Sequence, residues 1–371
     1  MVKGVGSSWR GLLLPVLLAV VLLVAIPLDL FPWLRGPAPY PPEWQWGLRS
    51  DPVGRWLPAL LVAGLLLGLV AACASSWASR RPRRAATTLL AVGVLAGWAF
   101  QLSLAATLPD GAFRTLLSRA ASRTFTSYHT VAISEDARDP RAFLAHHAFQ
   151  LARYRTTAKH AATHPPGPVL FYRTALWACE ESTWLTESLL RLAGLPDRDF
   201  APPNTRAARA AALLGAATVF AVAALAETLG LHRLAAAQVG LLYALLPGPA
   251  LMVPQFDGAL ALPVAAATAL LASAIATRRR VMPKAAGAGA LAALALFTSY
   301  GAAVFLAIGG LAALALAPSR REAARTGALT LVLATGTAAL LTAASTLLGH
   351  DPIASARTAL AIHREVYTAP R

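Results

Sequence analysis

Long apolar runs alternate with short basic segments along almost the whole chain. Most runs approach the ~20 residues that an α-helix needs to cross a bilayer. They lie at Gly11–Phe31, Leu57–Trp77, Ala85–Thr107, Ala207–Leu229, Ala235–Met252, Gly258–Ala276, Ala285–Ala317 and Thr326–Leu348. The run Ala285–Ala317 is interrupted at Thr298–Gly301, which predicts a hairpin of two short spans. We therefore expect an all-α, polytopic integral membrane protein with about nine transmembrane helices.

The basic residues between the runs predict how the chain is oriented. Turns rich in Lys and Arg mark the cytoplasmic side of a membrane. The turns Arg80–Arg84, Arg278–Lys284 and Arg320–Arg325 all fit one parity, with a cytoplasmic N-terminus. No small-x-small cleavage site precedes Pro32-Trp33, so we interpret the first run as a span and not as a cleaved signal peptide.

Four parts follow from this pattern. Residues 1–107 are expected to hold three transmembrane helices, and residues 108–206 one large extracytoplasmic loop that carries amphipathic, interfacial helices. Residues 207–348 are expected to form a bundle of about six transmembrane helices. Residues 349–371 are then an extracytoplasmic tail.

Composition supports a membrane protein and excludes other classes. Of 371 residues, 57% are hydrophobic and 13% charged, about half the charged fraction of a soluble domain. The net charge of +16 sits in short turns, so membrane lipids and not nucleic acid are the expected neighbours. Cys73 and Cys179 are too few for a disulfide framework or a zinc site. Abundant Ala, Arg and Gly suggest a GC-rich bacterial genome, and hence a bacterial plasma membrane.

The most distinctive polar segment is His164-Pro165-Pro166-Gly167-Pro168, inside the large loop. The two prolines give a rigid, extended backbone, and glycine permits the close approach of a ligand. We predict that a helix restarts at Pro168, runs to Ala193 and lies near the membrane surface. The alternative is that the segment only starts this helix and binds nothing.

Carboxylates in the loop are candidates for a general base, which takes a proton from an attacking hydroxyl. Asp136 and Asp139 are the two we favour, although a solvated turn paired with Arg138 and Arg141 would also explain them. Asp257 is predicted at the outer start of a helix. A carboxylate is stabilised there by the helix dipole, so N-capping and lining of a site are both open.

Several basic residues and histidines of the loop are candidates for binding a phosphate group. They are Arg153, Arg155, Lys159, His160 and His164, for which contact with lipid headgroups is the alternative. His129, His160 and His164 together could hold a metal, but no spacing demands it, so we assign no metal ligand and leave a divalent cofactor open. Tyr300, in the interrupted hairpin, is expected either to line a cavity or to pack at a kink.

The segment Thr163–Tyr172 resembles the "HPPG" region of polytopic glycosyltransferases of the GT-C class, and Tyr128–Ala132 and Asp139–Leu144 resemble loop sequences of such proteins. The resemblance implies transfer of a sugar from a polyprenyl-phosphate donor to a cell-envelope acceptor on the outer face. It also implies that His129, Pro165, Pro166 and Gly167 contribute to substrate binding. The acidic residue that the family places early in this loop has no counterpart in 123–127, and three spans precede the loop where one is commoner.

Two other functions fit the same pattern. A transporter or flippase normally buries ionisable residues in its spans, and these runs are almost free of charge, with Glu227 near an inner end. A non-catalytic envelope scaffold would agree with the missing early acid. Because the chain ends at Arg371 without a further domain, we expect it to be shortened relative to similar proteins.

Overall fold

The computed structural model describes residues 30, 52–123, 127–184, 187–188, 201–246, 256–317, 319, 321 and 323–368. All regular elements in these ranges are helices and none is a strand, which confirms the all-α prediction. Met1–Arg55 and Trp56–Arg371 form two separate units, and the fold below is that of the second. The predicted first span, Gly11–Phe31, lies outside the described residues except for Leu30.

The second unit begins with α2 (Leu57–Ala72), the short α3 (Ser76–Arg80) and α4 (Pro82–Ala106). We predicted one span over Leu57–Trp77, but the helix ends at Ala72. The Ser75 hydroxyl accepts a hydrogen bond from the Ala78 amide at 3.2 Å and so caps a new helix. Arg81 separates this helix from α4, which starts with proline, the residue best tolerated in a first turn.

Two further helices follow. The first, α11 (Ala201–Thr228), packs against α4, and the second, α12 (Arg233–Tyr243), packs against both α2 and α4. Their shared core contains Leu66, Leu89, Val219 and Leu241 among other buried side chains. The predicted span Ala235–Met252 is represented by α12 only, because residues 247–255 are not described.

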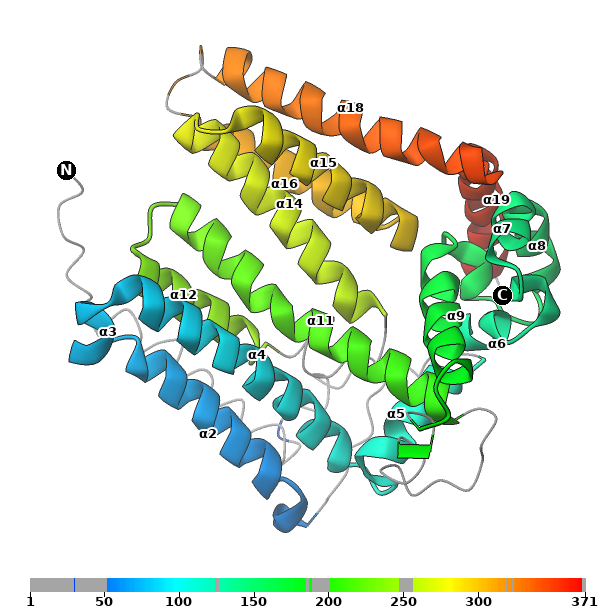
Figure 1. Cartoon of the computed structure of the whole chain (residues 1–371), viewed down its shortest axis with the longest axis horizontal. Helices are drawn as coiled ribbons and strands as arrows, with labels where there is room; N and C mark the ends of the chain where they lie inside the picture. Colours follow the sequence, from blue (N-terminus) through cyan, green and yellow to red (C-terminus); the bar gives the residue numbers. More distant parts are fainter. Residues whose placement is uncertain are drawn as a thin grey trace. The chain divides into compact units, whose positions relative to one another are not determined.

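The third group contains α14 (Asp257–Thr277), α15 (Val281–Thr298), α16 (Ala302–Ala315) and α18 (Ala328–Ala344). Figure 1 shows these helices side by side, and α14 also lies along α11. The chain leaves the helix at Ser299 and re-enters it at Ala302, which confirms the predicted interruption of this hairpin.

Four of the described helices are long and apolar enough to cross a membrane. They are Pro82–Ala106, Gly258–Thr277, Val281–Thr298 and Arg325–Leu348. Shorter apolar helices cover Leu57–Ala72, Leu213–Thr228 and Ala302–Ala315. These lengths agree with a membrane protein, while the number of spans and their orientation stay predictions.

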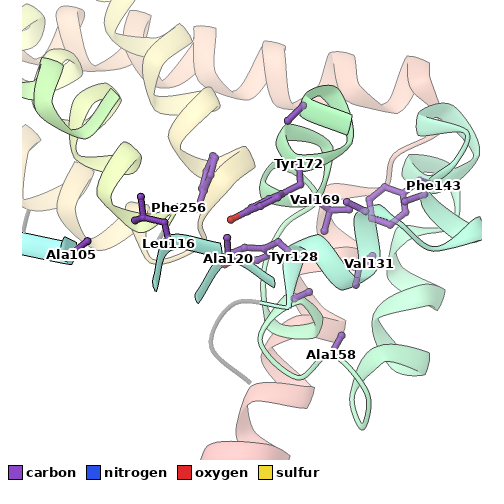
Figure 2. Packing of buried hydrophobic residues seen from close by; sticks show 14 residues of the cluster. Ala105, Leu116, Ala120, Tyr128, Val131, Phe143, Ala158, Val169, Tyr172 and Phe256 are labelled. Carbon is purple, nitrogen blue, oxygen red and sulfur yellow. The ribbon is translucent and has the colours of Figure 1, made fainter. Parts of the chain in front are cut away.

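The predicted loop folds into a layer of short helices. They are α5 (Gly111–Ala121), α6 (Tyr128–Ala132), α7 (Pro140–Ala145), α8 (His147–Tyr154) and α9 (Gly167–Glu180), with 3₁₀ turns η4 (Glu135–Ala137) and η5 (Ala161–Thr163). Tyr128, Val131, Phe143 and Tyr172 form their core together with Phe256 at the start of α14 (Figure 2). The layer is therefore joined to the long helices by a continuous apolar core.

The C-terminal tail, for which we predicted only an extracytoplasmic location, contains α19 (Pro352–His363). This helix packs against α8 and η5 of the loop, and Figure 1 shows it next to α8. The predicted helix Pro168–Ala193 is wrong in its extent, because α9 ends at Glu180 and the chain turns at Glu181. Ser182 and Thr183 follow at once, and both residue types favour helix ends over helix interiors.

Candidate functional site

The proline-rich segment forms an elbow whose residues are packed inside the protein. Pro165, Pro166, Gly167 and Pro168 are all buried. A Cβ at Gly167 would collide with the backbone carbonyl oxygen of Phe297, at the end of α15. We predicted that Gly167 allows a ligand to approach closely, but in the structure it allows α15 to do so. The elbow therefore holds α9 against α15.

Histidines on either side of this elbow form a compact aromatic group around Tyr128. The rings of His160 and His164 lie 4.2 Å apart, and both are within 5.6 Å of the Tyr128 ring. The Nδ1 atom of His164 donates to the carbonyl oxygen of His160 at 2.7 Å. The structure thus brings together two of the histidines that the sequence singled out.

His160 and His129 are poor cations. Burial, and to a smaller extent the adjacent His164, lowers the pKa of His160 to about 4. Burial alone lowers the pKa of His129, in α6, to about 4. Both are therefore neutral at pH 7, which suits hydrogen bonding better than charge pairing with a phosphate. Among the described residues, no group of three His, Cys, Asp or Glu side chains is arranged to hold a metal ion.

Asp136 is the better connected of the two predicted loop acids. Its Oδ1 accepts from Arg153 Nη1 at 3.2 Å, and its Oδ2 accepts from the Tyr154 hydroxyl at 2.7 Å. Burial, together with the hydrogen bond to Asp136, raises the pKa of the Tyr154 hydroxyl above its usual range. Both carboxylate oxygens therefore accept hydrogen bonds within the protein, and Arg153, which we predicted to bind phosphate, donates one of them.

Asp139 caps a helix. Its Oδ1 accepts from the backbone amides of Arg141 at 2.8 Å and Ala142 at 3.3 Å, at the start of α7. The paired, solvated turn that we considered forms nearby, between Glu135 and Arg138 at 3.4 Å. Asp257 is the first residue of α14, and its side chain lies outside the description, so its role stays a prediction.

The two remaining basic candidates lie on the surface. Arg155 pairs with Glu365 at 3.4 Å, which links the loop to the π-helical turn Arg364–Thr368 that follows α19. Lys159 is exposed. The structure therefore does not gather the five predicted phosphate ligands into one site, although each stays accessible or close to the histidine group.

A cavity of about 700 Å³ lies where the elbow, the membrane helices and α19 meet. We call it the Arg357 cavity. Its wall includes Pro165 of the elbow, Phe297 in the last turn of α15, Tyr300 just after α15, and the polar residues Ser345, His350 and Arg357. Tyr300 thus lines a cavity, which is one of the two positions expected for it. Most of the remaining wall is apolar.

A chain of buried hydrogen bonds supports one side of this cavity. The Ser355 hydroxyl lies 3.0 Å from His147 Nδ1 and 3.2 Å from His350 Nε2. His350 Nδ1 in turn lies 3.2 Å from the Ser345 hydroxyl. Burial, assisted by His350, lowers the pKa of His147 to about 3, and burial also lowers the pKa of His350. Neutral imidazoles therefore tie α8, α18 and α19 together.

A second cavity, of about 1020 Å³, lies among α14, α15, α16 and α18. We call it the Asp351 cavity, since Asp351 at the start of α19 lines one end. Four residues line both cavities: Leu296, Thr342, Pro352 and Ile353. The two cavities therefore meet beneath the first turn of α19.

Sequence reasoning missed His350, Asp351 and Arg357. A signal for α19 was present, because Asp351-Pro352 repeats the Asp139-Pro140 pair that starts α7. An Asp N-cap followed by proline at the first helical position is a strong helix start. No family model, curated protein or solved structure matches this chain with significance, so the site is argued from its own residues.

Proposed function

We propose that this protein is a membrane glycosyltransferase, which moves a sugar from a polyprenyl-phosphate donor to a cell-envelope acceptor. The observation that carries the proposal is the Arg357 cavity. A donor of this class needs an apolar chamber for its isoprenoid tail and cationic or hydrogen-bonding groups for its phosphate. The cavity offers an apolar wall from α15 and α18, with Arg357 and the neutral His350 on one side.

Arg357 is suited to the phosphate because it is exposed and forms no ion pair with another described residue. A guanidinium binds two phosphate oxygens at once through its planar fork. The adjoining wall residue Pro165 belongs to the segment that resembles the glycosyltransferase motif. The motif and the cationic helix thus meet at one cavity, which supports the proposal from two independent directions.

We further propose that the chain crosses a bacterial plasma membrane about nine times, with the N-terminus in the cytoplasm and the layer α5–α9 outside. In that arrangement the apolar part of the cavity lies at membrane depth and its polar end at the outer surface. Topology is testable with single-cysteine variants at exposed positions, such as Lys159→Cys outside and Arg279→Cys inside, in a Cys73→Ala, Cys179→Ala background. A membrane-impermeant thiol reagent should label only the first.

The transfer requires a base for the acceptor hydroxyl and a cation for the departing phosphate. Asp136, Asp139 and Asp257 remain the candidate bases from the sequence. Asp136 would have to release Tyr154 or Arg153 before it could accept a proton, and Asp139 offers only the oxygen that does not cap α7. His129, His160 and Lys159 would then contact the sugar and its phosphate from the loop side.

The decisive experiment is transfer of labelled sugar from a panel of polyprenyl-phosphate sugars into envelope material. Membranes that hold wild-type protein are compared with Asp136→Asn, Asp139→Asn and Asp257→Asn variants. Glu135→Gln serves as the control, since Glu135 is an exposed acid next to Asp136 with one surface ion pair. Incorporation that depends on the wild-type protein supports the enzyme. No incorporation from any donor by folded protein would favour a scaffold.

A further inference from the structure

The proposed donor lipid occupies the Arg357 cavity and leaves the Asp351 cavity without an occupant. Its wall is built largely of small residues on facing helices, including Ala292, Ala303, Gly310, Ala334 and Ala338. Small side chains would allow these helices to pack closely, but the helices leave a space of about 1020 Å³ between them. The cavity is larger than the Arg357 cavity, and its lining is more apolar.

The charged side chains that line the two cavities near α19 have opposite signs. Among the described lining residues, Arg357 is the one permanent charge of the first cavity and Asp351 the one charge of the second. A lipid phosphate would be attracted to the first and repelled by the second. The second cavity therefore suits a lipid whose headgroup is uncharged.

The helix α19 also sets the spacing between these two charges. Asp351 precedes Arg357 by six positions, which corresponds to a rise of about 9 Å along a helix. Pro352 and Ile353, which line both cavities, lie between them. A glycosyl ring fits between a phosphate held at one end of this interval and a hydroxyl held at the other.

One oxygen of Asp351 remains available for chemistry. Its Oδ1 accepts from the amides of Ile353 at 3.0 Å and Ala354 at 2.8 Å, as an N-cap. Its Oδ2 accepts from no donor among the described residues, and the residue is exposed. The carboxylate is thus oriented by one oxygen, while the other is free of hydrogen bonds to the described residues and belongs to a residue that lines the Asp351 cavity.

We propose that the acceptor is itself a membrane lipid with an uncharged, hydroxylated headgroup, and that its apolar chain lies in the Asp351 cavity. This inference rests on the proposed glycosyl transfer and names its acceptor. Asp351 then accepts the proton of the attacking hydroxyl. The hydroxyl oxygen forms a bond to the anomeric carbon, and the bond from that carbon to the phosphate oxygen breaks. The electron pair leaves with the polyprenyl phosphate beside Arg357, and Asp351 returns its proton to water.

Binding is tested with a photoactivatable diacylglycerol in proteoliposomes of phosphatidylcholine. Ala343 and Ala344 are neighbours on one turn of α18, but the first lines the Asp351 cavity and the second the Arg357 cavity. Ala343→Phe should lower crosslinking at least about tenfold, the effect of 1.4 kcal/mol, whereas Ala344→Phe should leave it unchanged. Ala328→Phe, exposed and in neither wall, is the control. Equal crosslinking in all three variants would overturn the inference even if the protein transfers no sugar.

The fate of the sugar provides the second readout. With a donor that supports transfer, label should appear in lipid that organic solvent extracts, including added diacylglycerol. Asp351→Asn should lower the turnover at least about 100-fold without unfolding the protein, since asparagine caps helices as well as aspartate does. Label confined to solvent-insoluble polymer or protein would overturn the lipid acceptor and leave the proposed transferase intact.

Discussion

Gly167 and Phe297 approach so closely that the backbone of α9 rests on the last carbonyl groups of α15. Any side chain at position 167 would push these helices apart. We expect Gly167→Ala to destabilise the protein by about 1–3 kcal/mol, the usual cost of overpacking. The apparent unfolding temperature in detergent measures this. Gly336→Ala is the matched control, because a Cβ at Gly336 meets no atom within 4 Å, and it should be neutral or slightly stabilising.

The buried chain of hydrogen bonds through Ser355 predicts a second stability effect. Replacing Ser355 with alanine removes a hydrogen-bond partner of His147 and one of the two partners of His350. A buried polar group without its partner costs about 1–3 kcal/mol, so Ser355→Ala should unfold at a lower denaturant concentration. Ser79→Ala removes a hydroxyl that is exposed and bonded only within its own helix, and it should change the midpoint little. A midpoint equal to wild type for Ser355→Ala would contradict the network.

The same network gives stability a defined dependence on pH. The pKa of His147 is about 3 in the folded protein, against about 6.5 in an unfolded chain. Between these values the unfolded chain binds more protons, so the free energy of unfolding falls as pH falls. The contribution is at most about 1.4 kcal/mol per pH unit. Unfolding temperatures from pH 7 to pH 4 should fall less steeply in His147→Gln than in wild type, whereas the exposed neighbour His146 should tolerate the same change without effect.

Asp136 allows stability and chemistry to be separated. Its ion pair with Arg153 is more than half exposed on the arginine side, and pairs of this kind contribute at most about 1 kcal/mol. Asp136→Asn should therefore keep the fold, as measured by circular dichroism and the unfolding temperature. If the base is Asp136 and not Asp351, sugar transfer falls by at least about 100-fold in the same preparation. Tyr154→Phe, which frees one carboxylate oxygen, should then change the rate without abolishing it.

Local signals in the sequence predicted much of the helical framework. The interruption at Thr298–Gly301 and the helix start at the proline-rich elbow follow from residues next to each other in the chain. The end of α9 was missed because apolar periodicity continues past Glu180, although the chain leaves the helix at Glu181 and Ser182. The tail helix was missed because the capping pair Asp351-Pro352 was not used as a signal for a helix start.

The site could not be predicted from local signals because its walls come from distant segments. The Arg357 cavity combines Pro165, Tyr300 and Arg357, which only tertiary packing brings together. Gly167 is a second case in which the local sequence does not reveal the tertiary neighbour. The sequence indicates a glycine where something approaches closely, but it does not tell whether a ligand or a helix does so.

Arg357 provides the most direct test of the donor site. We expect Arg357→Gln to raise the KM for a polyprenyl-phosphate sugar about 10- to 150-fold, which corresponds to the 1.5–3 kcal/mol of a hydrogen bond to a charged group. Arg357→Lys keeps the charge but loses the planar fork, so it should recover part of the affinity. Arg279→Gln removes an exposed arginine after α14 and should leave KM unchanged. Because Arg357 lies on an exposed face of α19, all three variants should fold, and an unaltered KM in Arg357→Gln would remove the phosphate from this cavity.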